Sequence, residues 1–156
     1  MSSLVLFSGV VLAETYTLTV KVTVVEKTCD VYGSGGPNQP ISVDFGDMVI
    51  KNVNGTNYET EIPYTLNCED AASNPALKLK FDGTRMTGQA ANVLTTSDKN
   101  LGLRLKAGGS NLNLGTWRNF NYATKLVLTA TPIGSGTGGI NDGQMTATGT
   151  LSVEYQ

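Results

Sequence analysis

Two cysteines, Cys29 and Cys68, have the most distinctive chemistry in this 156-residue sequence, which contains no histidine. Two thiols either form a disulfide in an oxidising compartment or stay reduced and buried. A bond would close a loop of about forty residues and stabilise the fold by about 3–4 kcal/mol in the chain-entropy model. Without histidine, the commonest general base and the usual partner of a nucleophilic serine or cysteine are missing. The sequence therefore predicts no catalytic site.

The acidic residues give no strong candidate for catalysis or for a metal site. Asp44 and Asp47, on either side of Phe45-Gly46, form a tight acidic pair. Aspartates in such a place typically support a turn, and the further ligands of a calcium loop are missing. A secreted hydrolase built on Asp44, Asp47 or Asp82 stays a minor alternative, because their spacing singles out no acid–base pair. We expect neither a metal nor a cofactor.

An aromatic cluster between Thr116 and Tyr122 contains Trp117, Arg118 and Phe120. Aromatic rings beside arginine and asparagine can stack on a sugar and hydrogen-bond to it. The same rings can cover one end of a β-sandwich core, and this packing role is the favoured interpretation. A secreted carbohydrate-binding module, with Trp117, Arg118 and Tyr122 as its site, is the alternative function.

The charge and the first residues of the chain indicate an exported protein. Net charge is −2, charged residues make up 15 % of the sequence, and no basic stripe is present, so nucleic acid is not an expected partner. The apolar run 4–12 is too short to span a bilayer and ends in Val11-Leu12-Ala13, which resembles the end of a secretory signal cleaved after Ala13. No lysine or arginine precedes the run, so either the true start lies upstream or the run is foreign to the protein. A buried N-terminal strand is the alternative interpretation. Export favours a Cys29–Cys68 disulfide.

Alternating apolar and polar residues at both ends of the chain predict a strand at each end. Residues 16–25 alternate almost strictly, with Tyr16, Leu18, Val20, Val22 and Val24 on one face. Residues 145–156 alternate as well, with one face made by Met145, Ala147, Gly149, Leu151, Val153 and Tyr155. Two such strands can pair within one molecule or with other molecules.

Shorter alternating segments between these ends predict an all-β fold. We expect strands at 41–45, 59–68, 76–81, 101–105 and 124–131, with a glycine-rich loop at 134–143. Pro63 interrupts the second of these segments and must lie at an edge or point outward. About seven or eight short strands at this spacing predict a sandwich of immunoglobulin-like type.

The sequence resembles the subunits of bacterial chaperone–usher pili, of the type 1 and P pilus kind, over residues 14–156. An alternating extension, residues 14–26, precedes Cys29, and the segment Val-Asp-Phe-Gly-Asp at 43–47 follows it. The chain ends in an alternating strand with a penultimate aromatic residue, Tyr155, and Gly143 is fourteenth from the C-terminus. These two features form the end signature that pilus chaperones recognise in this family.

The resemblance implies an incomplete immunoglobulin-like β-sandwich that lacks its last strand and has one disulfide. The missing strand leaves a hydrophobic groove, which a periplasmic chaperone fills first. At the outer-membrane usher, the N-terminal strand of another subunit then replaces the chaperone, which is β-strand addition between molecules. The expected function is a structural pilin, major or minor, of an adhesive fimbria on the cell surface.

Carried onto this sequence, the resemblance divides the chain into a truncated signal peptide (1–13), a donor-strand extension (14–26) and a pilin domain (27–156). The donor face is the row of five apolar residues from Tyr16 to Val24. Val22 stands where many family members have glycine, so the receiving groove is expected to be deeper there, or the register differs by two residues. The strand that lies along the groove and meets the chaperone comprises Gly143, Met145, Ala147, Leu151, Val153 and Tyr155.

Overall fold

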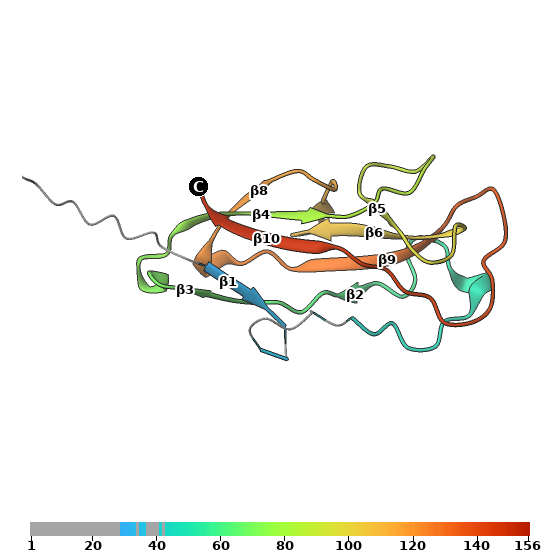
Figure 1. Cartoon of the computed structure of the whole chain (residues 1–156), viewed down its shortest axis with the longest axis horizontal. Coiled ribbons are helices and arrows are strands. Elements are labelled where there is room, and N and C mark those ends of the chain that lie inside the picture. Colours follow the sequence, from blue (N-terminus) through green and yellow to red (C-terminus); the bar gives the residue numbers. More distant parts are fainter. Residues whose placement is uncertain (1–28, 34, 37–40, 42) are drawn as a thin grey trace, which may run out of the picture.

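The computed structural model describes residues 29–33, 35, 36, 41 and 43–156, which form an elongated sandwich of antiparallel strands (Figure 1). The first strands are β1 (Cys29–Tyr32), β2 (Thr60–Glu61), β3 (Thr65–Cys68), β4 (Ala76–Asp82) and β5 (Val93–Thr95). The later strands are β6 (Leu101–Ala107), β7 (Ser110–Asn111), β8 (Arg118–Asn121), β9 (Leu128–Gly134) and β10 (Thr150–Tyr155). Three short 3-10 helices are η1 (Ile50–Asn52), η2 (Ala71–Ser73) and η3 (Tyr122–Thr124). In this part of the chain, none of the helices has the length and apolar character needed to cross a membrane.

The strands form two main layers and one short pair. One layer has the strand order β10-β4-β8, and the other has the order β2-β9-β6-β5, with β7 paired to β6. β1 and β3 form the short pair, which the Cys29–Cys68 disulfide joins. The predicted disulfide and the predicted all-β fold are therefore confirmed.

The core lies between the two layers and follows the alternation of the sequence. In β4, Leu77 and Leu79 are fully buried, while the intervening Lys78 and Lys80 are partly exposed. Leu77 and Leu79 pack in one cluster with Leu105 of β6 and Leu128 of β9. Each buried leucine contributes about 1.5–3 kcal/mol, so the buried face of β4 stabilises the sandwich.

Pro63 divides the segment 59–68 into two strands that join different partners. β2 pairs with β9, whereas β3 pairs with β1. Pro63 is exposed between them, as its missing N–H requires. The single strand expected at 59–68 is therefore wrong in extent, although the outward position of Pro63 is confirmed.

Three other expected strands also differ from the structure. β9 begins at Leu128 instead of residue 124, because η3 and a short connection occupy residues 122–127. The described residues of 41–45 and all of 145–149 belong to no strand. Their apolar side chains alternate, but alternation reports which face is covered and does not by itself supply a hydrogen-bonding partner.

Candidate functional site

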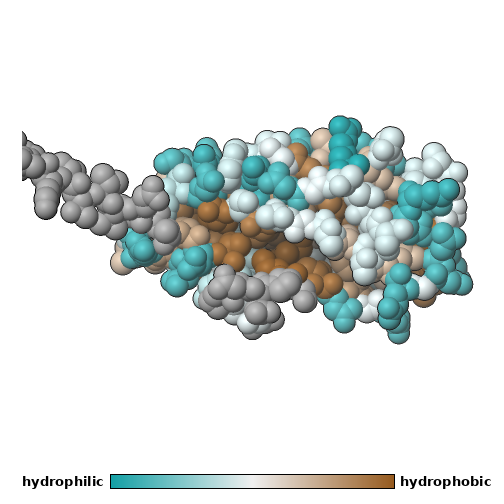
Figure 2. All heavy atoms as spheres, in the orientation of Figure 1, coloured by the Kyte–Doolittle hydropathy of each residue, from teal (hydrophilic) through white to brown (hydrophobic). Residues whose placement is uncertain are grey.

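An apolar groove of about 1110 Å³ runs along one face of the sandwich, beside the segment that leads into β10. Figure 2 shows it as a hollow of apolar surface along the middle of the face seen there. Its floor comes from the core layers and includes Ile62, Leu103, Leu105 and Ala130. The groove exposes side chains that continue directly into the hydrophobic core.

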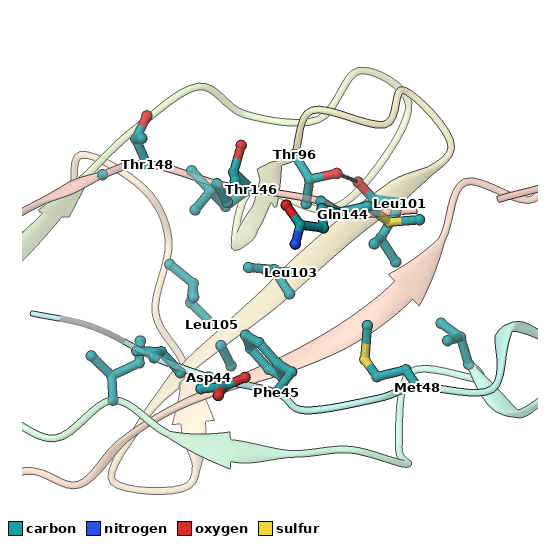
Figure 3. A pocket seen from close by; sticks show the side chains of 18 of the residues that line it. Asp44, Phe45, Met48, Thr96, Leu101, Leu103, Leu105, Gln144, Thr146 and Thr148 are labelled. Atoms are coloured by element: carbon teal, nitrogen blue, oxygen red, sulfur yellow. Dashed lines mark hydrogen bonds between the residues drawn. The ribbon is translucent and has the colours of Figure 1, made fainter. Parts of the chain in front are cut away.

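One wall of the groove is the segment 43–53. Val43 and Phe45 lie on the groove and pack against the core, and Met48 lies further along in Figure 3. Asp44 shapes the turn in this wall, because its carboxylate Oδ1 accepts a hydrogen bond of 2.8 Å from the backbone N–H of Gly46. The turn role predicted for Asp44 is therefore confirmed.

The opposite wall is the segment 140–149, which carries Gln144, Thr146 and Thr148 in Figure 3. Gly149 lets this wall lie against the floor, since a Cβ atom there would be 2.2 Å from Cε1 of Phe81. Gly143 has φ +118°, which favours glycine, and no atom lies within 4 Å of a Cβ built there. Glycine is therefore favoured at the two positions for different reasons: the close approach of Phe81 at Gly149 and the backbone conformation at Gly143.

β10 continues this wall and is hydrogen-bonded on one side. Its ladder to β4 runs from Thr150, opposite Asp82, to Tyr155, opposite Leu77. β1 lies close to β10, but among the described residues no strand pairs with the other side of β10. Backbone groups along that side are the groups that an added strand would need.

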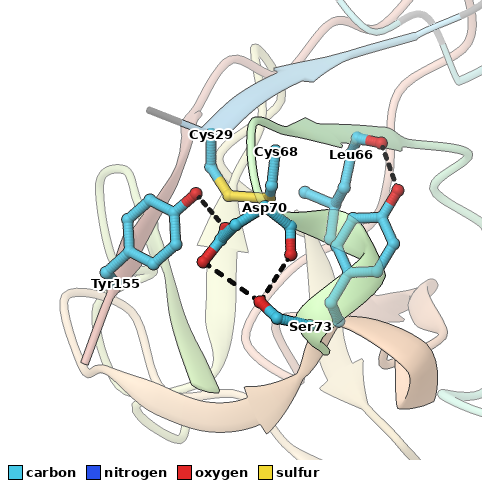
Figure 4. The surroundings of a disulfide bond; sticks show 7 residues. Cys29, Leu66, Cys68, Asp70, Ser73 and Tyr155 are labelled. Atoms are coloured by element: carbon cyan, nitrogen blue, oxygen red, sulfur yellow. Dashed lines mark hydrogen bonds between the residues drawn. A yellow bond between two sulfur atoms is a disulfide. The ribbon is translucent and has the colours of Figure 1, made fainter. Parts of the chain in front are cut away.

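The disulfide and the end of β10 meet at one corner of the domain (Figure 4). The hydroxyl of Tyr155 donates a hydrogen bond of 2.8 Å to Oδ1 of Asp70, two residues after Cys68. Ser73 donates a second hydrogen bond of 2.8 Å to the carbonyl oxygen of Asp70. Partial burial of the ring, together with the hydrogen bond to Asp70, raises the pKa of Tyr155 to about 12. The tyrosine is thus neutral at all physiological pH values and acts as a donor.

The structure brings most of the predicted groove residues together. Gly143, Met145, Ala147 and Leu151 line the groove. Val153 and Tyr155 lie further along β10 and pack against the core. The predicted donor residues Tyr16, Leu18, Val20, Val22 and Val24 lie outside the described residues. The floor residues were not predicted as part of the site, although their apolar positions in the expected strands were an available signal.

Trp117 does not combine with Arg118 and Tyr122 into a sugar-binding platform. Lys78 Nζ and Lys80 Nζ lie 4.7 and 4.8 Å from the centre of the Trp117 ring. Arg118 points elsewhere and donates a hydrogen bond of 2.6 Å to the carbonyl oxygen of Asn111. Tyr122 packs against the core. The packing interpretation of this cluster is therefore confirmed for Tyr122, whereas the ring of Trp117 makes cation–π contacts with the two lysines.

The described acidic residues do not come together as a metal site. Within the described part of the chain, no three side chains of histidine, cysteine, aspartate or glutamate lie close enough to hold a metal ion. Asp82 forms an ion pair with Lys80 at 3.3 Å on the outer face of β4. The apolar groove is the feature that the geometry favours as the functional site.

Comparisons with known proteins agree with this geometry. The model of the family "Fimbrial protein" matches residues 16–156. The chain is 31% identical to the uncharacterized fimbrial-like protein YfcR of Escherichia coli K12 over 132 residues, which cover 82% of this chain and 73% of YfcR. It is 30% identical to the fimbrial-like protein YfcQ of the same organism over 134 residues, which cover 83% of this chain and 80% of YfcQ.

Two solved pilus subunits have the same architecture. The P pilus adaptor subunit PapF is 26% identical, with a TM-score of 0.62, and the match covers 82% of this chain and 95% of PapF. The P pilus rod subunit PapA, at 20% identity, shows the fold alone, with a TM-score of 0.64 and coverage of 90% of this chain and all of PapA. The sandwich is thus the incomplete immunoglobulin-like fold of pilins. The chain belongs to the fimbrial protein family, and it is a structural subunit of a pilus.

Proposed function

We propose that this subunit polymerises by donor-strand exchange. Residues 14–26 of one copy enter the groove of a neighbouring subunit, and the groove of this chain receives the corresponding strand of another. The observation that carries the proposal is the open apolar groove beside β10, whose ladder lies on one side. An added strand would gain backbone hydrogen bonds from that side and bury alternate side chains in the groove.

The apolar face of residues 14–26 has the size that such a reaction needs. Burying Tyr16, Leu18, Val20, Val22 and Val24 at about 1.5–3 kcal/mol each contributes on the order of 10 kcal/mol before ordering costs. The lining offers leucine, isoleucine, valine and phenylalanine side chains in return. This chemistry selects an extended apolar strand over a small polar ligand.

Before assembly, the groove needs a temporary cover, because an exposed strand edge above an apolar surface promotes aggregation. We propose a periplasmic chaperone in this role, with Tyr155 and the end of β10 as its anchor, and an outer-membrane usher as the place of exchange. The signal peptide would comprise residues 1–13 and the pilin domain residues 27–156. The subunit would reach the cell surface through the periplasm and contribute to adhesion.

The proposed role is structural and involves no enzymatic activity. The fimbrial family and the pilus subunits with the same fold support this inference. The sequence also lacks histidine, the commonest general base.

The test compares the folding stability of residues 27–156 with that of the same chain carrying residues 14–26 at its C-terminus through a short flexible linker. We expect the first protein to aggregate or melt at low temperature and the second to be monomeric with a much higher melting temperature. A matched control appends the same segment with Leu18→Asp, Val20→Asp and Val22→Asp.

The control segment keeps the length and the backbone donors but cannot enter an apolar groove. A high, cooperative melting transition of residues 27–156 alone would contradict the proposal, because the sandwich would then be complete. Equal stabilisation by the native and the aspartate-substituted segments would contradict it too.

A further inference from the structure

The groove wall at residues 140–149 is attached to the domain by a polar turn, not by a strand ladder. β10 begins its ladder at Thr150, and residues 140–149 pair with no strand among the described residues. The turn at 96–100 connects β5 to β6 and lies against this wall. Within the described residues, the hydrogen bonds from 140–149 to the rest of the domain end on Ser97 and Asp98.

Asp98 is the buried centre of this attachment, with a residue exposure of 7%. Its carboxylate Oδ2 accepts a hydrogen bond of 2.7 Å from the backbone N–H of Asn141. Oδ1 accepts a bond of 2.8 Å from the backbone N–H of Asn100. Bonds to an ionised carboxylate are about twice as strong as neutral ones, so a single side chain joins the turn firmly to the wall.

Ser97 makes a second attachment at Thr146, five residues further along the wall than Asn141. Its backbone N–H donates a hydrogen bond of 2.7 Å to the carbonyl oxygen of Thr146. Its Oγ accepts a bond of 3.0 Å from the backbone N–H of Thr146. Asn100 holds the residue just before the wall, through a bond of 2.8 Å from Nδ2 to the carbonyl oxygen of Gly139.

The spacing of these attachments matters because Met145 and Ala147, on either side of Thr146, line the groove. These hydrogen bonds hold the wall in place without a strand ladder. The backbone of the wall is therefore ordered before a donor strand binds. A binding surface that is ordered in advance loses less conformational entropy on binding.

We propose that Asp98 is a positioning residue for strand acceptance, which fixes the 140–149 wall so that it is ready to receive a donor strand. The inference rests on the proposed donor-strand exchange and adds which residue prepares the groove. Loss of the carboxylate frees the wall at Asn141, and the inserted strand is then held less tightly.

The test uses the full chain with a second copy of residues 14–26 joined to its C-terminus by a flexible linker. A fluorescent peptide of residues 14–26 competes for the groove, and the rate at which it displaces the appended strand is measured. Amide hydrogen exchange at Asn141 and Thr146 reports the state of the wall. Variants are Asp98→Ala, Asp98→Asn and Ser97→Ala. Asp82→Asn is the control, because it removes a carboxylate from a partly exposed ion pair with Lys80.

In Asp98→Ala, we expect faster exchange at the Asn141 amide and about tenfold faster displacement, the effect of one hydrogen bond to a charged group. Asp98→Asn keeps a carbonyl oxygen that can accept one of the two bonds, so it should restore part of both properties. Ser97→Ala should act mainly on the Thr146 amide, with a smaller effect on displacement. Asp82→Asn should match the parent protein in both measurements.

Two results would overturn the role of Asp98. One is unchanged protection of the Asn141 amide in Asp98→Ala, and the other is loss of that protection with an unchanged displacement rate. If Asp98→Ala does not fold, the milder Asp98→Asn and Ser97→Ala variants decide by the same criteria. A parent protein that the appended strand does not stabilise at all would instead refute donor-strand exchange, and the role of Asp98 with it.

Discussion

The hydroxyl of Tyr155, at the end of β10, donates a hydrogen bond to the carboxylate of Asp70. The end of the last strand is therefore attached to the segment that follows the disulfide. Gln156 adds a bond of 2.7 Å from Nε2 to the carbonyl oxygen of Leu77 on β4. The last strand is thus held at its end by side chains as well as by its ladder, whereas its approach along 140–149 depends on the polar turn at 96–100.

Tyr155→Phe should lower the free energy of unfolding by about 1 kcal/mol, because it removes one partly exposed hydrogen bond and keeps the ring. Urea unfolding of the chain with the appended donor strand would measure the difference. Asp70→Asn keeps an acceptor and should cost less. If the double variant loses as much as the sum of the two single variants, the hydroxyl and the carboxylate do not act together.

Acid should weaken the attachment of the groove wall through Asp98. The hydrogen bonds from Asn100 and Asn141 lower the pKa of Asp98 below its ordinary value of 3.8. A lowered pKa in the folded state stabilises the protein above pH 3.8, and this contribution is lost as the pH falls through the folded value. The stability difference between the parent and Asp98→Asn should therefore be constant near neutral pH and shrink below pH 3.8. Unfolding curves at a series of pH values measure it, and a difference that grows on acidification would contradict the assignment.

Gly149→Ala should disturb the contact between the groove wall and its floor. The added Cβ would be 2.2 Å from Cε1 of Phe81, so the ring or the wall must move, at a cost of about 1–3 kcal/mol. Gly139→Ala is the matched control, since no atom lies within 4 Å of a Cβ at that position. Adding Phe81→Leu to Gly149→Ala should recover part of the loss in thermal stability. No recovery would show that the ring is not what the new methyl group meets.

Reduction of the Cys29–Cys68 disulfide should destabilise the domain by about 3–4 kcal/mol, because it releases a loop with a sequence separation of 39 residues. The paired variant Cys29→Ser with Cys68→Ser should melt at the temperature of the reduced parent. Calorimetry with and without a reducing agent gives both values. A reduced protein as stable as the oxidised one would mean that the pairing of β1 with β3 suffices without the bond.

Sequence patterns were sufficient for β4 and β6, which have a neighbouring strand on both sides in their layers. Lys78 and Lys80 alternate with buried leucines in β4, and the structure places them as the pattern predicts. The expected strands at 41–45 and 145–149 have no ladder in the described residues, yet these two segments form the two walls of the groove. Such alternation suits a segment that pairs with a strand from another molecule, which is the role proposed for residues 14–26.

The attachment around Asp98 could not be predicted in the same way. The segment Thr96-Ser-Asp-Lys-Asn100 has the composition of an ordinary surface turn, and Asn141 and Thr146 lie more than forty residues away in the chain. Only the folded path of both segments buries the carboxylate and brings it to the backbone of the wall. Hydrogen bonds to distant backbone groups leave no periodic signal in a single sequence.

The position of Cys29 has a mechanical consequence for a pilus. The proposed donor segment ends at residue 26, so a pull from a neighbouring subunit would enter the domain at Cys29. β1 has four residues paired with β3, and under tension such a ladder would peel apart from its loaded end. The disulfide transfers the load at that point to Cys68, so covalent bonds bear it. Each subunit of such a fibre would then bear tension at the start of its domain without relying on the β1–β3 ladder.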